Sequence, residues 1–302
     1  MSEQLEFVGI GGLAGDLVLQ MDELPGRDDK YFVPPPQKVS GGFIANATVA
    51  AALLGLGTGY VGWIGEDDDG RWLEGEFLAS GIGQEDLAMV RDPDIPTPLN
   101  LVMIDTQGNR AIIIPASPHY QGQLIEHQLT LIARSKVAYS YARDMQWIKD
   151  MAGAVHSGGG VLVIDSEATF GLSRSEFDEV AALTDTLFIS QDVITAFGYD
   201  SLESIPVRGW IIQTSGSQGA YGYDVEMGIH VQQSAFKVDA VDTTGAGDCY
   251  HAAVVLGRIR GWSLQESLRF ASGAAAIKVQ HIGARGGLPT YDEVMQFLAE
   301  KS

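Results

Sequence analysis

Residues 241–257 read VDTTGAGDCYHAAVVLG and bring together residue types that could handle an anion and a proton. Gly245, Ala246 and Gly247 leave the backbone nearly bare, and Asp248 follows just as an apolar helical run begins. Backbone N–H groups at a helix N-terminus bind phosphate, and a carboxylate beside them can accept a proton. The same carboxylate would also stabilise the start of a helix through its dipole. The segment alone therefore leaves two interpretations open, an anion site and a helix cap.

A second glycine pair lies in the segment SGGFIANATVAAALLGLG at residues 40–57. Gly41 and Gly42 open a run of small residues with helical spacing, and Asn46 falls on its first turns. The run is interpreted either as a closely packed Ala/Gly helix or as a second ligand-binding turn. The acids at residues 66–68 are expected to cap the next helix rather than to act in catalysis.

The segment VGIGGLAGD at residues 8–16 matches the glycine pattern of dinucleotide-binding proteins through Gly9, Gly11 and Ala14. That pattern requires a helix directly afterwards, whose N-terminus receives the pyrophosphate. The next residues, DLVLQMDEL, alternate with a period of two, so we expect a strand and no dinucleotide-binding fold. The sequence also lacks the phosphate-binding pattern GxxxxGK followed by Ser or Thr.

The elements that would position these motifs alternate regularly from about residue 135 onward. Apolar β-branched runs predict strands at residues 136–141, 161–165, 186–190 and 209–215. Helical spacing predicts helices near residues 143–155, 173–183, 245–260, 263–281 and 290–299, with a short one after residue 190. Because these strands are continuously apolar, they suit a parallel sheet buried on both faces. We therefore predict an α/β fold with a doubly wound core sheet flanked by helices.

The first 120 residues do not follow this alternation. Residues 16–25 and 30–35 read as half-exposed strands interrupted by proline, and residues 97–115 read as two strands joined by a hairpin turn at TQGN. We expect these segments, near 16–39 and 97–115, to form a small β-sheet inserted in a single domain that spans residues 1–302. This sheet would cover the core as a lid.

The overall composition limits the kinds of partner. The 302 residues include 19 basic and 39 acidic side chains, a net charge of −20, which argues against nucleic-acid or anionic-membrane binding. No apolar run is long enough to span a bilayer, and residues 1–7 lack a signal pattern, so a cytoplasmic protein is expected. The single cysteine, Cys249, excludes an internal disulfide, and the six histidines show no metal-ligand spacing.

Taken in order, these stretches resemble the ribokinase-like (PfkB) family of carbohydrate kinases over about residues 7–298. DTTGAGD (242–248) is similar to the C-terminal signature of that family, and GGFIAN (41–46) to its N-terminal signature. TSGSQGA (214–220) lies where the family has a nucleotide-contacting turn, and GAR (283–285) follows the last long helix as its counterpart does. The resemblance implies a ribokinase-like core sheet with a small β-sheet lid.

The resemblance also implies an ATP-dependent sugar kinase that transfers the γ-phosphoryl group to a hydroxyl, with Mg²⁺ bridging the phosphates. Asp248 would be the general base, and it is expected to stay ionised beside a helix N-terminus. The backbone N–H groups of the preceding turn would form the anion hole: Gly245, Ala246 and Gly247. The sugar would be held by Asp16, Gly41, Gly42 and Asn46. The nucleotide would be lined by Thr214, Gly216, Gly219, Ser272 and Gly283. A monovalent-cation requirement stays open.

One segment departs from the family pattern. Family members often carry Asn-x-x-Glu after the strand that ends here at Ile189, an arrangement tied to Mg²⁺ and phosphate, whereas this sequence has Ser190-Gln191-Asp192-Val193. The metal ligands are therefore unassigned, with Asp165, Glu167 and Asp192 as candidates. The departure keeps a second hypothesis open, a sensor that binds sugar or nucleotide without turnover. A nucleoside kinase is a further alternative.

Within the family, AFKVDAVDTTGAGD, RFASGAAAIK, IIIPASP and Lys30-Tyr31 are most similar to the sulfofructose kinase branch. An anionic sugar would require cations near the lid, and Lys30, Arg110 and Arg143 are candidates, although each is alternatively a solvated surface charge. Neutral ketoses and keto-deoxy sugar acids stay open as acceptors. A lid sheet with one exposed face often pairs with a second copy, so a homodimer is expected. His251 and Cys249 are interpreted as structural.

Overall fold

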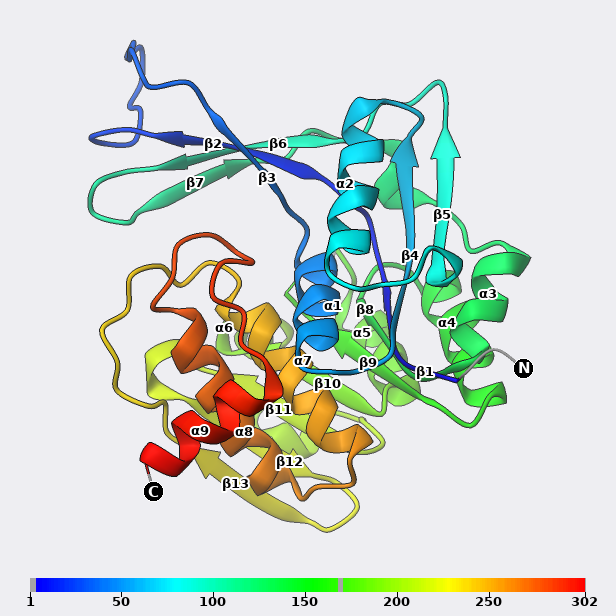
Figure 1. Ribbon diagram of the computed structural model, residues 1–302. Helices are drawn as coiled ribbons and strands as arrows, with labels where there is room; N and C mark the ends of the chain where they lie inside the picture. The colour runs from blue at the N-terminus through cyan, green and yellow to red at the C-terminus, as the bar shows by residue number, and fades with distance from the viewer. Residues whose placement is uncertain (1–3, 168–170, 302) are drawn as a thin grey trace.

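The computed structural model describes residues 4–167 and 171–301, in which the larger of two sheets has nine strands (Figure 1). Their order is β13-β12-β11-β10-β9-β8-β1-β4-β5. The strands from β11 to β5 pair in parallel, which confirms the predicted core, and β12 and β13 add an antiparallel edge that the sequence patterns did not indicate. Their bounds are β1 Leu5–Ile10, β4 Thr58–Gly65, β5 Leu87–Asp92, β8 Ser135–Tyr141, β9 Val161–Asp165, β10 Thr186–Ser190, β11 Trp210–Thr214, β12 Ala220–Asp224 and β13 Ile229–Gln233.

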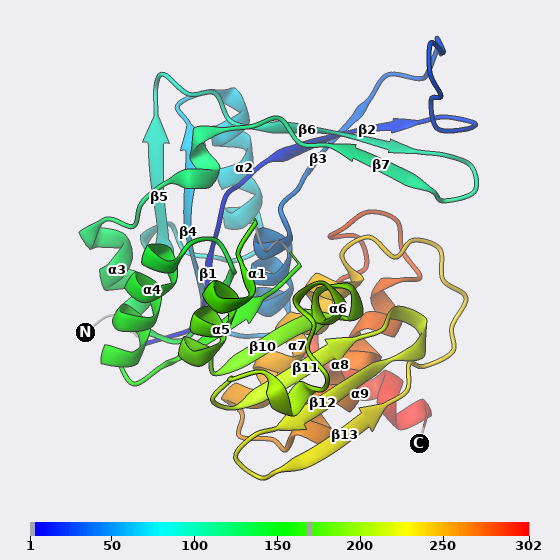
Figure 2. The same ribbon diagram turned by 180° about the vertical axis from the view of Figure 1, so that it is seen from behind.

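Helices cover both faces of this sheet, and a separate hydrophobic cluster fills each interface. One face carries α1 Phe43–Leu53, α2 Asp68–Ala79, α7 Ala246–Ile259, α8 Leu264–Lys278 and α9 Tyr291–Glu300 (Figure 1). The other carries α3 Glu126–Ala133, α4 Met145–Ser157, α5 Arg174–Leu183 and α6 Gln191–Phe197 (Figure 2). The two-sided burial explains why the strands read as continuous apolar runs; all eight residues of β4 are buried.

The predicted helices are confirmed to within a few residues, and their capping residues explain where they begin. Asp144 caps α4, and capping boxes start α5 at Ser173, α8 at Ser263 and α9 at Thr290. Asp67 caps α2 by accepting the N–H of Gly70, so the expected capping role of this acidic run is confirmed. Within the described residues, no helix combines the length and apolar character that crossing a bilayer requires.

The second sheet has four strands in the order β3-β2-β6-β7, with bounds β2 Gly15–Gln20, β3 Gln37–Ser40, β6 Leu99–Ile104 and β7 Arg110–Ile113. It projects beyond the core, on the side toward which the segments before α7 and after α8 rise (Figures 1 and 2). The predicted hairpin turn is confirmed, with Gly108 at φ 82°. The predicted strand at residues 30–35 is wrong: three successive prolines, residues 34–36, have no N–H for a ladder, and the strand begins at Gln37.

Candidate active site

The glycine turn before α7 has the geometry that its sequence suggested. Gly245 occupies the N-cap position in the left-handed region, with φ 75°. A Cβ at Gly245 would also lie 2.3 Å from the carbonyl oxygen of Ala284, so both the backbone conformation and the lack of space exclude a side chain here. Gly247 faces open space, with no heavy atom within 4 Å of its Cβ position. Asp248 follows in the first turn of α7 and is buried, with 7% of its surface exposed.

The N–H of Ala246 donates to the carbonyl oxygen of Thr243 at 3.1 Å. This hydrogen bond closes the turn that leads into the helix. It also means that, of the three N–H groups expected to form an anion hole, the one from Ala246 already has a partner within the chain. The bare backbone at Gly245 and Gly247 is the part of the turn that best fits an incoming anion.

A relay of hydrogen bonds connects Asp248 to two distant parts of the chain. Asn46, in α1, donates from Nδ2 to Oδ2 of Asp248 at 2.9 Å. Arg285, beyond α8, donates from Nε to Oδ1 of the same amide at 3.0 Å. These two contacts fix which end of the Asn46 amide faces the carboxyl group. Arg285 belongs to the GAR triplet but was not among the predicted site residues, and its contact with Asn46 makes it the main addition to the candidate site.

Burial raises the pKa of Asp248 to about 7, from an ordinary value of 3.8. The hydrogen bond from Asn46 and the nearby His251 oppose this shift, while the carboxylates of Asp165 and Glu167 add to it. With this pKa the carboxyl group is only about half ionised at neutral pH, less than a helix N-terminus alone would favour, because the loss of hydration opposes ionisation. A carboxyl group with this pKa exchanges a proton readily at neutral pH.

The acceptor side of the site is built from the first turn of α1 and two strands of the small sheet. Asp16 on β2 accepts a hydrogen bond at 2.8 Å from Nδ2 of Asn100, its register partner on β6. Gly41 lies against that carboxylate, since a Cβ there would be 2.4 Å from Oδ1 of Asp16. Gly42 is the N-cap of α1 at φ 91°, which only glycine adopts without strain.

Asn100 belongs to the same group, and the sequence analysis did not single it out. Its Oδ1 is buried and has no hydrogen-bond partner in the described residues. Burial raises the pKa of Asp16, while the hydrogen bond from Asn100 and the nearby Arg285 guanidinium lower it. Arg285 therefore interacts with both ends of the site, the Asp16 end and the Asp248 end.

The three candidate cations for an anionic acceptor lie in different places. Arg110, at the start of β7, donates from Nη1 to Oγ1 of Thr244 at 3.4 Å, so the small sheet contacts the segment that leads into the glycine turn before α7. Arg143 donates to Oδ2 of Asp144 at 2.8 Å and its guanidinium lies 3.8 Å from the Trp147 ring centroid, so it stabilises the start of α4. Lys30 is exposed in the loop between β2 and β3.

The expected nucleotide residues fall in two groups. Thr214 ends β11, and Gly216 and Gly219 shape the turn after it with φ values of 53° and 103°. Gly283 follows α8 at φ 85° and donates its N–H to Oδ2 of Asp242 at 2.7 Å, which brings the loop after α8 beside the catalytic turn. Ser272 is buried within α8 with 5% exposure, so it is the least accessible of the group.

Of the three candidate metal ligands, Asp165 is buried, whereas Glu167 and Asp192 are exposed. Asp165 is 3% exposed and accepts a hydrogen bond from the Tyr139 hydroxyl at 3.2 Å, and its Oδ2 lies 3.1 Å from Nδ1 of His251. Desolvation raises the pKa of Glu167, and so does the charge of Asp165. Asp192 lies exposed in the first turn of α6, which Ser190 caps.

These residues fit a loosely held Mg²⁺ better than a protein-caged one. Among the residues that the structure describes, there is no group of three or more His, Cys, Asp or Glu side chains suited to a metal ion. Mg²⁺ usually keeps several waters and is bound through one or two carboxylates together with substrate phosphates. Asp165 and Glu167 provide two carboxylates whose mutual repulsion a divalent cation would relieve.

His251 and Cys249 are packed into the core, as the sequence analysis interpreted them. The ring of His251 stacks on Phe188 with centroids 3.8 Å apart. Cys249 is fully buried, and burial raises the pKa of its thiol to about 12, so a reactive thiolate is excluded near neutral pH. The Nε2 atom of His251 is buried without a partner in the described part of the chain.

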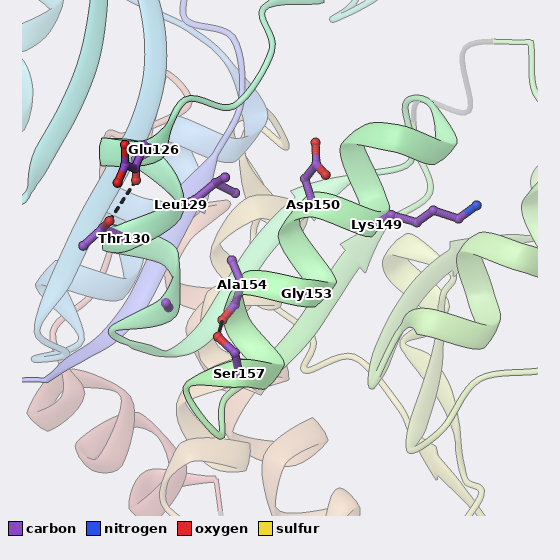
Figure 3. A pocket seen from close by; sticks show the side chains of 9 residues that line it. Glu126, Leu129, Thr130, Lys149, Asp150, Gly153, Ala154 and Ser157 are labelled. Atoms are coloured by element: carbon purple, nitrogen blue, oxygen red, sulfur yellow. Dashed lines mark hydrogen bonds between the residues drawn. The ribbon is translucent and has the colours of Figure 1, made fainter.

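A surface hollow of about 530 Å³ between α3 and α4 is separate from this site. Figure 3 shows its lining, in which Thr130 and Ser157 donate hydrogen bonds to carbonyl oxygens of their own helices. It lies on the sheet face opposite α7, and no residue predicted for catalysis or binding lines it. The hollow therefore offers no chemistry comparable to that around Asp248.

Comparison with known proteins identifies the family and the fold. The family model described as pfkB family carbohydrate kinase matches residues 6–291. The chain belongs to this family. It is accordingly a phosphotransferase with an alcohol group as acceptor, and a kinase of sugars or nucleosides.

Individual relatives of this kinase cover almost its whole length. A nucleoside kinase from Methanothermobacter thermautotrophicus is 26% identical over 99% of this chain and 98% of its own. The structure of Arabidopsis thaliana ribokinase complexed with ribose and ATP superposes with a TM-score of 0.82 at 24% identity, covering 97% of this chain and 98% of that one. A putative ribokinase II from E. coli in complex with ATP and Mg²⁺ gives a TM-score of 0.79 at 19% identity, covering 98% and 99%. These structural likenesses establish the ribokinase fold.

Proposed function

We propose that this family member is an ATP-dependent sugar kinase in which Asp248 is the general base. The observation that carries the proposal is a buried carboxyl group with a pKa of about 7, placed directly behind a glycine turn at a helix N-terminus. A general base is most effective when its pKa lies near the working pH. A protein that only binds sugar or nucleotide does not need a proton acceptor, and burying a carboxyl group lowers the stability of the folded state. The buried Asp248 therefore argues against the sensor hypothesis.

In the proposed reaction, the acceptor hydroxyl lies beside Asp248 and loses its proton to that carboxylate as its oxygen bonds to the γ-phosphorus of ATP. The bond between that phosphorus and the β,γ-bridging oxygen breaks, and ADP leaves. The N–H groups of Gly245 and Gly247 stabilise the charge that develops on the transferring group. Asn46 orients the base through its hydrogen bond to Oδ2. When bound, Mg²⁺ neutralises the phosphate charge, and Asp165 and Glu167 are the residues that would hold it.

The acceptor class follows from the polar groups around Asp16. A carboxylate with a neighbouring amide, as in Asp16 and Asn100, suits a pair of vicinal hydroxyls and discriminates against acceptors that lack one. A furanose or open-chain polyol, free or as the sugar of a nucleoside, fits this set. An anionic acceptor such as a sulfonated ketose would depend on Arg110, the candidate cation that touches the catalytic turn.

We also propose that the protein is a homodimer formed through the small sheet. The side chains of residues 112–114, at and beyond the end of β7, are 47%, 53% and 63% exposed although all three are isoleucine. An exposed apolar strand at a sheet edge favours pairing with a second copy. Size-exclusion chromatography with light scattering tests this assembly.

The proposed function is tested by measuring ADP release from Mg-ATP with a panel of acceptors: neutral ketoses and aldoses, sugar acids, sulfonated ketoses and nucleosides. Asp248→Asn is measured alongside, with Asp292→Asn, an exposed acid in the first turn of α9, as the matched control. Turnover with one acceptor that is lost in Asp248→Asn and kept in Asp292→Asn supports the proposal. Sugar and ATP binding without turnover for any acceptor would favour the sensor.

A further inference from the structure

Lys278 is unusual because it is a fully buried lysine in an acidic protein. Within residues 4–167 and 171–301, it is the only lysine or arginine in the buried class, and its exposure is 0%. An ammonium group without water requires compensating partners, because burial of a charge is costly. The residue ends α8, so its side chain lies where α8 gives way to the loop that carries Arg285.

The partners of this ammonium group belong to two different loops. Nζ donates to the carbonyl oxygen of Asp242 at 3.4 Å and to that of His281 at 3.2 Å. Asp242 precedes the glycine turn of α7, and His281 precedes the segment that contains Arg285. Lys278 therefore bridges the backbone of the two segments that meet at the proposed anion hole, and these segments rise side by side in Figures 1 and 2.

Further contacts tie the same two segments together. The Asp242 carboxylate accepts the N–H of Thr244 at 2.9 Å on its own loop and that of Gly283 at 2.7 Å on the other. The N–H groups of Val241 and Asp242 both donate to the carbonyl oxygen of Val279. Negative charge is thus concentrated around Lys278, and both Asp242 and Asp248 attract its ammonium group.

Without a cation at this junction, the carbonyl oxygens of Asp242 and His281 would face one another across the gap between the loops with no shared donor. Their repulsion would separate the loops and move Gly245 away from Ala284, against whose carbonyl oxygen it fits. A displacement of the turn by about 1 Å is enough to lower turnover on the order of 100-fold.

We propose that Lys278 acts as a built-in monovalent cation that holds the two loops in the geometry of the anion hole, so that turnover does not depend on a dissolved monovalent cation. The inference rests on the proposed function, since it concerns the same catalytic turn. Lys278 is a positioning residue here, because its ammonium group contacts backbone carbonyls and not the reacting atoms.

The first test uses the unmodified protein. ADP release is measured with the best acceptor in tetramethylammonium buffers of constant ionic strength, with and without potassium, ammonium or sodium chloride. We expect kcat to change by less than about twofold, because the cation position is already filled. A requirement of the wild-type protein for added potassium or ammonium would overturn the inference without affecting the proposed kinase function.

The second test replaces the ammonium group. Lys278→Met keeps most of the side-chain volume without the charge, and Lys278→Ala leaves a space lined by the two carbonyl oxygens. We expect both to lower kcat on the order of 100-fold, with less change in KM, and added ammonium or potassium to restore Lys278→Ala by about tenfold but not Lys278→Met. Lys149→Met, which removes an exposed lysine of α4, is the control (Figure 3).

The outcomes separate the inference from the proposed function. Full activity of Lys278→Met would overturn the role of the cation while leaving the kinase intact. Failure of every cation to restore folded Lys278→Ala, checked by its melting temperature, would also overturn it. Absence of turnover in the wild-type protein would instead contradict the proposed function itself.

Discussion

Replacing Asp248 with Asn should lower activity and raise stability at the same time. Removal of a positioned general base typically costs about 10²–10⁴-fold in rate, so kcat should fall by that factor while sugar binding is retained. The stability effect follows from the buried carboxyl group, whose pKa is about 7 in the folded protein against an ordinary value of 3.8. Because the folded pKa is raised, protonation favours the folded state, and stability is lost as the pH rises from about 4 to about 7.

The size of the stability effect can be worked out from the same two values. A difference of about three pKa units corresponds to at most about 4 kcal/mol of destabilisation above pH 7. At pH 5, which is about one unit above the pKa of the unfolded state, ionisation of this carboxyl group destabilises the folded protein by only about 1–2 kcal/mol. Asp248→Asn, which cannot ionise, should therefore raise the free energy of unfolding by about 2–3 kcal/mol more at pH 8 than at pH 5.

Three measurements check this reasoning. Urea unfolding at pH 5 and pH 8 gives the difference in stability between wild type and Asp248→Asn, with Asp292→Asn as the control. The kcat of the wild-type protein should fall about tenfold per unit below pH 7, because only the ionised carboxylate accepts the proton. A flat rate profile between pH 5 and pH 7, an equal stability gain at both pH values, or more than a tenth of wild-type kcat in Asp248→Asn would refute the argument.

Two further substitutions test the geometry of the site. Gly245→Ala should abolish turnover and lower the melting temperature, because its Cβ would lie 2.3 Å from the carbonyl oxygen of Ala284 and its φ is 75°; Gly153→Ala, in the open middle of α4, should instead stabilise the protein by about 0.5–1 kcal/mol and leave kcat unchanged. Arg285→Met should reduce kcat/KM by about 10²-fold, since removing the guanidinium donor frees the Asn46 amide. Arg285→Gln should keep part of the activity because it retains an N–H donor. Equal activity of Met and Gln at this position would contradict the relay, and normal turnover of Gly245→Ala would contradict the anion hole.

The fold was predictable where its signals are local. Continuous apolar strands, capping residues and glycine turns each depend on a few neighbouring residues, and the strands and helices from residue 135 onward follow them closely. The strand expected at residues 30–35 failed because the β-favouring run Tyr31-Phe32-Val33 suggested a ladder that the following prolines cannot form. The β12–β13 edge has half-exposed strands whose weak periodicity gives little sign of pairing.

The candidate site was predictable only as separate motifs. The turn at residues 245–248 and the glycine pair at 41–42 are readable because glycine is required locally. The contacts that connect them are not: Asn46 and Asp248 are 202 residues apart, and Arg285 and Asn46 are 239 apart. Nothing in the spacing of single residues indicates such pairs. The same holds for Lys278, which in the sequence is simply a basic residue at the end of a helix.

The pKa of Asp248 also could not be predicted from a motif, because it depends on two nearby cations, Arg285 and Lys278, that form no hydrogen bond with the carboxyl group. Arg285 is close enough to interact with Asp248, yet it donates its hydrogen bond from Nε to Asn46, and the ammonium group of Lys278 bonds to backbone carbonyls. A direct ion pair with either cation would favour the ionised form and lower the pKa of the carboxyl group well below neutrality. The amide of Asn46 and the loop backbone therefore lie between the Asp248 carboxyl group and these two cations. In the proposed mechanism, this separation keeps Asp248 basic enough to accept a proton, while the two cations hold the turn that contains it.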